Sequence, residues 1–389
     1  MAEPSLPLAG LRVIDTSTLL AGPLAAMLLA DFGAEVIKVE HPSGDPMRRF
    51  GHTQDDVSLW WKVFNRNKKS VVLDLSTGQG AANFRRLAVG ADALIENFRP
   101  GTLERWGLGP DELAAINPGL VVTRVTAFGQ TGPYARRPGF GTLAEAMSGL
   151  AAMSGEPDGA PLLPPFPMAD AFAGLHAACA TLIALRGRDK TGVGQSIDVA
   201  ITEAMMASLG AQLTVFEQLG VKPARLGNGS NNNAPRNVYR CRDGRWLAVS
   251  APADSIAERI VRLVGRPELC EEPWFATGRG RAEHAAVLNE AIGGWVAERD
   301  AATVLAAFEQ AQAAVAPVYD VADIVGDPHF KARRTIVEVP DEELGAVAMP
   351  DIPVRLSATP GRIRWAGPRL GEHTDEVLDA LAKETGNAR

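Results

Sequence analysis

Cysteine is scarce in this sequence, and histidine does not cluster. The 389 residues include three cysteines, Cys179, Cys241 and Cys270, and no CxxC pair. The six histidines show no metal-like spacing. These absences argue against a disulfide framework and against a metal site, and they are typical of a reducing compartment. We therefore expect a cytoplasmic protein without a metal ion.

Basic charge is also in deficit. Lysine and arginine number 39 against 46 aspartates and glutamates, a net charge of −7, whereas a general nucleic-acid binder needs a basic face. The first ten residues lack the cationic and apolar regions of a signal peptide, and we expect no apolar run long enough to span a bilayer. The sequence thus predicts neither a nucleic-acid partner nor a membrane partner.

Short apolar strands alternate with helical patterns through the first third of the chain. Strands are predicted at residues 11–14, 36–40, 71–75, 93–96 and 120–126. Such alternation is typical of an α/β fold with a mostly parallel sheet. No GxGxxG motif follows the first strand, so dinucleotide binding has no support.

The pattern changes at an asparagine-rich segment, residues 228–236. A hairpin is predicted after it, at residues 237–251, and then a series of helices. We interpret residues 1–227 as a large domain, 228–325 as a smaller α+β domain and 326–389 as a carboxy-terminal tail that returns to the large domain.

A long apolar segment, residues 171–186, begins directly after Asp170. Its large apolar residues recur at helical spacing and alanine fills most other positions, which predicts a helix buried on several sides. Asp170 stands where an N-cap belongs, and backbone N–H groups and the helix dipole would keep it ionised there. A capping role alone would explain this residue. His176, six residues on, is predicted to be a packed histidine on a different face.

Basic side chains recur near the ends of the predicted elements. If they face one cleft, they would bind a polyanionic cofactor tail, although a solvated surface would explain the same charges. They are Lys38, Lys68, Lys69, Arg99, Arg105, Arg136 and Arg137.

Six segments occur in an informative order between residues 8 and 378. They are LAGLRVIDTSTLLAGPLAAMLLADFGAEVIKVEHP, NRNKKSVVLDL, IENFRPGTLERWGL, RPGFGTLAEAMSG, MADAFAGLHAACATLIAL with TGVGQSIDVAITEAM, and LGEHTDEVL. As a set they resemble the class III CoA-transferase family, which includes formyl-CoA:oxalate transferases, carnitine CoA-transferases and 2-methylacyl-CoA racemases.

The resemblance implies an activity and a nucleophile. Members move CoA from an acyl-CoA thioester to a small carboxylic acid, so CoA is a substrate and no cofactor is tightly bound. Asp170 matches the nucleophile, which would form a mixed anhydride and then an aspartyl-CoA thioester. The fold implied is a Rossmann-like large domain with a smaller domain, in an interlocked homodimer.

The resemblance also implies a set of CoA-binding residues. They are Leu20, Ala21, His41, Asn65, Arg66, Asn67, Lys68, Asn97, Phe98, Arg99, Arg105, Arg137 and Phe140.

Some positions depart from the family pattern. Residues 227–237 replace the glycine-rich loop of formyl-CoA transferases, which argues against formyl/oxalate specificity. His41 stands where transferases can have arginine, and Gly141 where many members have an acidic residue. The Gly-His-Asp run of the racemases is absent at residues 138–141, so transfer is favoured over a racemase-type isomerase. A non-catalytic acyl-CoA-binding relative is the third alternative.

Overall fold

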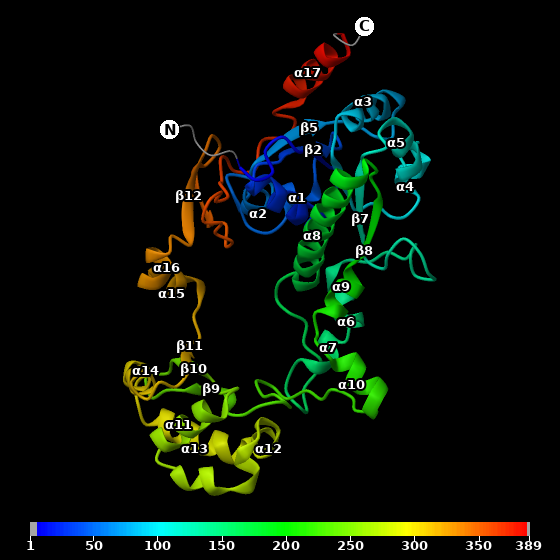
Figure 1. The fold of residues 1–389 in the computed structure, drawn as a ribbon. Helices are drawn as coiled ribbons and strands as arrows, with labels where there is room; N and C mark the ends of the chain where they lie inside the picture. Colours follow the sequence, from blue (N-terminus) through cyan, green and yellow to red (C-terminus); the bar gives the residue numbers. More distant parts are fainter. Residues whose placement is uncertain (1–5, 387–389) are drawn as a thin grey trace. The chain divides into compact units, whose positions relative to one another are not determined.

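The computed structural model describes residues 6–386, which form two compact units (Figure 1). The first unit comprises the chain up to Ala151, Leu163–Gly220 and the chain from His329 onward. The second comprises Ala152–Leu162 and Val221–Pro328. The second unit therefore begins seven residues before the predicted boundary at 228, and it takes in a segment that the sequence analysis assigned to the large domain.

A six-stranded parallel sheet is the centre of the first unit. The order of its strands is β5-β2-β1-β6-β7-β8. Their bounds are β1 (Arg12–Asp15), β2 (Glu35–Glu40), β5 (Lys68–Val72), β6 (Ala93–Glu96), β7 (Val121–Thr126) and β8 (Ser196–Ala200). The chain returns to the far side of β1 when it enters β6, so these two strands mark the switch point where α/β sheets bind ligands.

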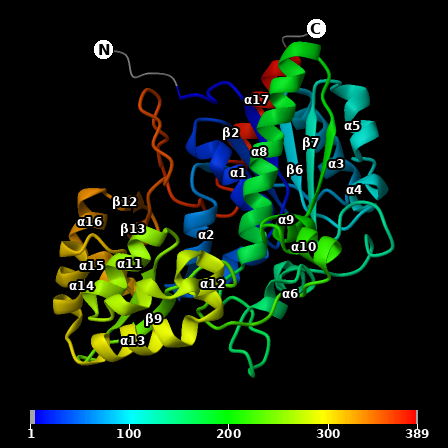
Figure 2. The same ribbon diagram turned by 60° about the horizontal axis from the view of Figure 1, so that its bottom comes forward.

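Helices cover both faces of this sheet (Figure 2). Neighbouring residues of one strand face opposite cores: Val13 packs with α1 and α8, and Ile14 packs with α3, α5 and α17. Strands buried on both faces explain the continuous apolar runs in the sequence. The first unit contains the helices α1 (Ala21–Asp31), α2 (Leu59–Phe64), α3 (Gly78–Val89), α4 (Thr102–Arg105), α5 (Pro110–Ile116), α6 (Gly141–Met147), α8 (Met168–Thr191), α9 (Ile201–Ala207), α10 (Gln212–Leu219) and α17 (Thr374–Gly386).

Helix α8 packs through its small residues, contrary to the prediction of a helix buried on several sides. Most of its buried residues are alanines and Gly174, and a Cβ at Gly174 would lie 2.8 Å from the carbonyl oxygen of Ala21 in α1. Several large apolar residues face outward, with Leu175 51% and Ile183 67% exposed, whereas Leu185 is only 4% exposed. His176 is exposed as well and was wrongly predicted to be packed. At Gly174 the close approach of α1 leaves no room for a larger side chain.

The same helix corrects the expectation that no apolar run could span a bilayer. In length and composition the 24-residue α8 could cross a membrane. In the structure it packs against α1 and the sheet, as the core helix of a globular unit does.

The carboxy-terminal stretch completes the first unit. The hairpin of β12 (Ile336–Asp341) and β13 (Gly345–Pro350) is followed by an extended segment and α17. The Asn67 N–H donates to the Trp365 carbonyl and the His373 N–H to the Ser70 carbonyl, at 3.1 and 2.9 Å. The far end of the chain is thus bonded to the β5 edge of the sheet.

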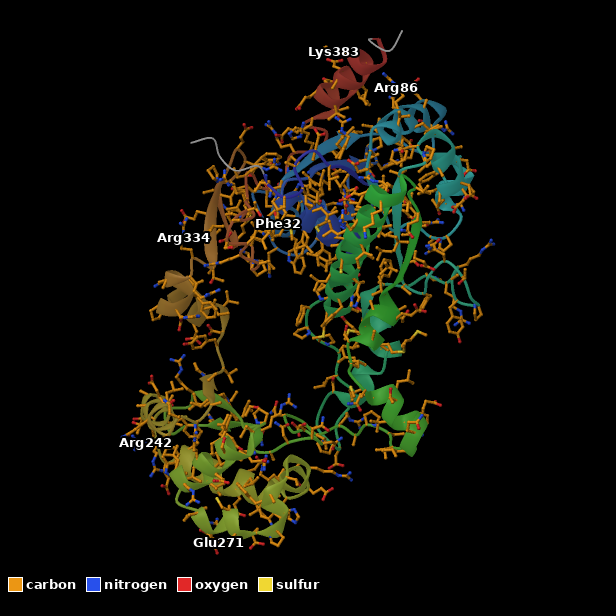
Figure 3. The ribbon with its side chains drawn as sticks, viewed as in Figure 1. Phe32, Arg86, Arg242, Glu271, Arg334 and Lys383 are labelled. Atoms are coloured by element: carbon orange, nitrogen blue, oxygen red, sulfur yellow. The ribbon has the colours of Figure 1, made fainter. Side chains whose placement is uncertain are left out.

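The second unit has its own core around a three-stranded antiparallel sheet, β11-β10-β9. Its surface carries ion pairs such as that of Arg242, labelled in Figure 3, with Asp300 at 2.7 Å. Its elements are β9 (Arg236–Arg240), β10 (Trp246–Ser250), β11 (Val315–Pro317), α11 (Asp254–Leu263), α12 (Gly278–Glu283), α13 (Ala285–Ala297), α14 (Ala301–Gln310), α15 (Val321–Gly326) and the 3₁₀ turns Pro267–Glu271 and Pro273–Ala276.

Several short elements had no sequence prediction. Two short helices, α6 and α7 (Leu150–Met153), follow the loop after β7, and the chain links them through Gly149 at φ +99°. The hairpin of β3 (Thr53–Gln54) and β4 (Val57–Ser58), the 3₁₀ turn Pro46–Arg49 and α16 (Pro328–Ala332) are likewise too short to show a periodic pattern.

Candidate active site

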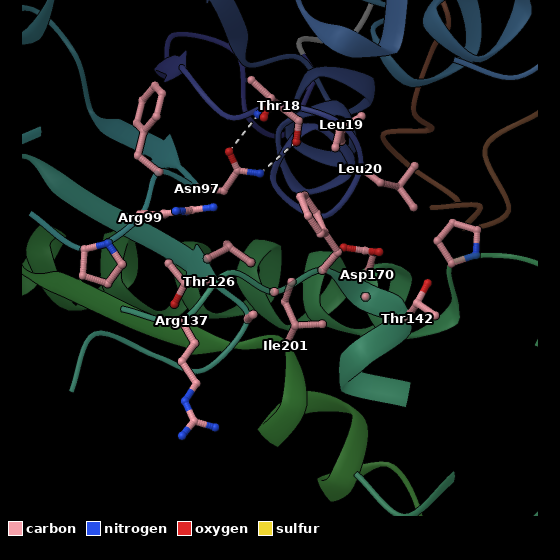
Figure 4. Close-up of a pocket in the computed structure, with 18 of the residues that line it drawn as sticks. Thr18, Leu19, Leu20, Asn97, Arg99, Thr126, Arg137, Thr142, Asp170 and Ile201 are labelled. Atoms are coloured by element: carbon pink, nitrogen blue, oxygen red, sulfur yellow. Dashed lines mark hydrogen bonds between the residues drawn. The ribbon is translucent and has the colours of Figure 1, made fainter. Parts of the chain in front are cut away.

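A cavity of about 470 Å³ lies in the first unit at the carboxyl end of the parallel sheet. Its wall comes from the loops after β1 and β6, the end of β7, the loop of residues 135–142 and the first turn of α8 (Figure 4). This is the switch point between β1 and β6, where an α/β sheet leaves a crevice. The volume is that of an ordinary small-molecule site.

Asp170 lies in this cavity, but it is not the N-cap that the sequence predicted. Helix α8 begins at Met168, Pro167 is the N-cap, and Asp170 is the third residue of the first turn. Burial, with a smaller contribution from the carboxylate of Glu145, raises the pKa of Asp170 to about 6. Because that pKa is about one unit below pH 7, roughly nine-tenths of the side chain is ionised there, as a stronger base than an ordinary aspartate.

Gly141, the first residue of α6, lies directly against this carboxylate. A Cβ built on Gly141 would lie 2.0 Å from Oδ2 of Asp170 and 2.7 Å from its Cγ. No side-chain carbon fits at such distances. The departure at position 141 therefore has a steric consequence, since only glycine leaves the Asp170 side chain in its observed place.

We predict that Gly141→Ala lowers kcat by ~10²-fold, because the added methyl group must displace the carboxylate from its reactive position. The variant is measured by steady-state kinetics together with its thermal midpoint. Gly78→Ala is the matched control, because Gly78 is also the first residue of a helix and a Cβ there would meet nothing within 4 Å. Unchanged kcat in Gly141→Ala would show that the position of the carboxylate does not matter for activity.

Asn97 joins the two loops at the switch point. Its Oδ1 accepts from the Thr18 N–H and its Nδ2 donates to the Thr18 carbonyl, both at 2.8 Å (Figure 4). The next residue, Leu19, has φ +61° and is held by a bond from its N–H to Asp45. Both polar atoms of the Asn97 amide therefore bind the Thr18 backbone and hold that part of the cavity wall in place.

Five other residues of the expected CoA-binding set also line the cavity. They are Leu20, Phe98, Arg99, Arg137 and Phe140. Arg99 and Arg137 are exposed, and the Arg137 guanidinium stacks over the Tyr134 ring at 3.8 Å from its centroid. The cavity mouth thus combines two cations with exposed apolar surface, including Phe140 at 64%.

Residues 65–68 lie in the interior and not at the cavity. Arg66 pairs with Asp31 at 2.7 Å, and Asn67 Nδ2 donates to Asp31 at 2.8 Å. Each of these side chains is at most 3% exposed. The structure therefore separates this segment from the cavity-lining residues and gives it partners within the chain.

Lys68 belongs to a buried ion cluster beneath the loop that follows β1. Its Nζ donates to Asp15 at 2.9 Å, to the Pro23 carbonyl at 2.8 Å and to Asn65 at 3.0 Å. Lys38 lies 3.7 Å from the same Asp15 carboxylate and donates to the Ser17 carbonyl. Burial lowers the pKa of Lys68 to about 8, and the Asp15 carboxylate opposes that shift. The cluster supports the backbone from which Thr18 and Leu20 reach the cavity.

The remaining members of the predicted set lie elsewhere. Ala21 is buried in the first turn of α1, His41 is exposed beside Ser43, and Arg105 is exposed and donates to the Gly101 carbonyl. Lys69 pairs with Glu35 and Glu376. The seven basic residues of the sequence analysis therefore do not form one cleft.

Sequence reasoning missed the hydroxyl groups of the cavity and one buried acid. Thr18, Thr126 and Thr142 line the wall, and Glu145 lies beneath it at 2% exposure. The spacing of Gly141 and Glu145, four residues apart on α6, would have placed them on one helix face. Within residues 6–386 no group of three or more His, Cys, Asp or Glu side chains is placed to hold a metal ion.

Comparison with known proteins gives consistent results over nearly the whole chain. The sequence model of CoA-transferase family III matches residues 8–374. Succinyl-CoA–D-citramalate CoA-transferase of Chloroflexus aurantiacus is 43% identical over 97% of this chain and 95% of its own length. The β subunit of succinyl-CoA–L-malate CoA-transferase from the same organism is also 43% identical, over 97% of this chain and 94% of its own length. A crystal structure of a CAIB/BAIF family protein from Brucella suis superposes with a TM-score of 0.85 at 33% sequence identity. The superposition covers 97% of this chain and 100% of that protein's chain.

Proposed function

Since the chain belongs to CoA-transferase family III and is a CoA-transferase, we propose that Asp170 is its covalent nucleophile. The Asp170 carboxylate attacks the acyl-CoA carbonyl. This forms a mixed anhydride on Asp170, and CoA leaves as its thiolate. The thiolate then attacks the aspartyl carbonyl, which gives an aspartyl-CoA thioester and frees the donor acid. The acceptor carboxylate repeats the two steps in reverse and restores Asp170.

One observation carries this proposal: a poorly solvated, ionised carboxylate in the wall of the cavity at the sheet's switch point. Carboxylate nucleophiles react better when water does not cover them. The racemase alternative is less well supported, because no histidine is among the described residues that line the cavity.

We propose that CoA binds across the loops after β1 and β6. Leu20, Phe98 and Phe140 offer apolar surface, and Arg99 and Arg137 offer charge for phosphate groups. Residues 65–68 contribute indirectly, through the buried ion cluster that supports Leu20.

We propose succinyl-CoA as donor and a small hydroxydicarboxylate as acceptor, as in the names of the two Chloroflexus relatives. Three threonines in the cavity wall supply hydroxyl groups for such an acid. Of the three, the Thr126 hydroxyl is buried and has no hydrogen-bond partner within the described chain.

We further propose that the enzyme is cytoplasmic and works as the interlocked homodimer expected of the family. Large apolar side chains remain exposed on the first unit, among them Ile183 on α8 and Leu219 on α10, at 67% and 71%. Exposed apolar surface of this kind favours burial against another chain. A second copy is the partner that the family resemblance suggests.

The test is capture of the acylated aspartate during turnover. With succinyl-CoA and L-malate or D-citramalate, hydroxylamine should convert Asp170 to a hydroxamate that peptide mass spectrometry detects, and acetate in place of the hydroxydicarboxylate should give little transfer. An unmodified Asp170 under turnover would contradict the covalent mechanism. Transfer to acetate alone would contradict the proposed acceptor.

A further inference from the structure

Glu145 is a buried acid that the mechanism above does not use. It lies on α6 with 2% of its surface exposed, and its Oε1 accepts a hydrogen bond from the Ala169 N–H at 3.2 Å. Ala169 belongs to the first turn of α8, whose N–H groups have no partner within the helix. Pro167, the N-cap residue, makes no side-chain capping bond, so Glu145 supplies a cap from another helix.

Helix α6 touches the nucleophile's turn at two points. Gly141 lies against the Asp170 carboxylate itself. Glu145, four residues later and so on the same face of α6, holds the N–H of the residue directly before Asp170. A shift of α8 relative to α6 would break the second contact and open the first, so the pair fixes where the carboxylate lies.

Of the charged groups around Asp170, one acid acts on it and no base pairs with it. In the described chain Glu145 is the one charged group that changes the pKa of Asp170, and neither acid has a basic partner among the described ion pairs. Arg99 and Arg137 are the other charged residues that line the cavity. Further charged or titratable groups on the surrounding elements include Arg136 on the cavity loop, Glu203 in the first turn of α9, and His176 on another face of α8.

We propose that Glu145 is a positioning residue that fixes the Asp170 carboxylate by capping α8 and, through its negative charge, keeps that carboxylate basic and reactive. This inference rests on the proposed role of Asp170 as nucleophile. The positive end of the α8 dipole stabilises the Glu145 charge in its buried place.

The charge has a direct consequence for the reaction. When Asp170 forms the anhydride or the thioester, its carboxylate becomes uncharged and the repulsion from Glu145 ends. Glu145 therefore disfavours the free carboxylate relative to both acylated forms. Its effect acts on the nucleophile and not on the binding of CoA.

The test compares Glu145→Gln and Glu145→Ala with wild type in the full-length enzyme, over pH 4.5 to 8. Wild-type kcat/KM should fall below pH ~6, because protonation of Asp170 removes the nucleophile. Glutamine keeps an acceptor for the Ala169 N–H but removes the charge. We expect its acidic limb to move to lower pH by about one unit and its kcat at pH 7 to fall ~3- to 10-fold, with KM for acyl-CoA little changed. Alanine should also lower the thermal midpoint, because the cap is lost.

Glu112→Gln is the matched control, since Glu112 is an exposed acid in the first turn of α5 outside the cavity. It should leave both the pH profile and kcat unchanged. A Glu145→Gln variant with a wild-type pH profile and kcat would overturn the inference. If wild type formed no Asp170 hydroxamate, the nucleophile itself would be wrong, so the two failures are distinguishable.

Discussion

Asp170→Asn is expected to lower kcat by about 10⁴-fold or more while leaving binding of CoA intact. The amide has nearly the same shape as the carboxylate but cannot form the anhydride, so every step through Asp170 stops. The measurement is steady-state transfer from succinyl-CoA, with CoA affinity determined by calorimetry. A folded Asp170→Asn variant that retains wild-type kcat would contradict the covalent mechanism.

The same variant should be more stable than wild type at neutral pH. The pKa of Asp170 is raised from 3.8 to about 6 in the folded chain, so its free carboxylate destabilises the fold above pH 6 and its protonated form does not. We expect a gain of about 1–3 kcal/mol in the free energy of unfolding at pH 7. The gain should shrink as pH falls through 6 and vanish near pH 4. Calorimetric unfolding at pH 7 and pH 4.5 measures it, and equal gains at both values would exclude ionisation as the cause.

Lys68→Met is expected to destabilise the first unit by about 3–5 kcal/mol, because it leaves the buried Asp15 carboxylate with one cation instead of two. The three hydrogen bonds of Lys68 Nζ would be lost together. Denaturant unfolding measures the change, and the loop that carries Leu20 should lose order with it.

Lys69→Met is the control for that experiment, since it is the neighbouring residue on the same strand. Its ion pairs with Glu35 and Glu376 lie at the surface, where such pairs contribute ~0–1 kcal/mol. Equal losses of stability in the two variants would show that burial of the Lys68 pair has no special weight.

Most strands of the parallel sheet could be predicted closely because they are buried on both faces. A continuous apolar run marks such a strand in the sequence without any knowledge of which strands it pairs with. Residues 93–96 form β6 as predicted, β2 and β7 each differ from prediction by one residue at one end, and β1 lies one residue later than predicted. The strand predicted at residues 71–75 was wrong by three residues, because β5 (Lys68–Val72) begins with two lysines and the apolar run marks only its end. The orientation of α8 could not be predicted, because leucine and alanine are both apolar and only the close approach of α1 decides which of them is buried.

The site was predictable in part. Asp170 and the loop residues after β1 and β6 do reach one cavity, since parallel strands deliver their carboxyl ends to one edge. The basic segment at residues 65–68 does not reach the cavity. The sequence alone does not distinguish a lysine that forms a buried ion pair, as Lys68 does, from one that binds phosphate. Glu145 went unnoticed because its relation to Asp170 depends on the packing of α6 on α8, through a hydrogen bond from Ala169, which lies 24 residues further along the chain.

The division of the first unit into three stretches bears on how the enzyme is made. Backbone hydrogen bonds between Asn67 and Trp365 and between His373 and Ser70 close the β5 edge with the stretch from His329 onward, which leaves the ribosome after the second unit. The second unit, which lies almost wholly within Val221–Pro328, is fully synthesised before that stretch. During translation the second unit can therefore finish folding first, while the unit that holds the cavity waits for the stretch from His329 onward. A ribosome that stalls near residue 330 would release a chain whose sheet edge is still open.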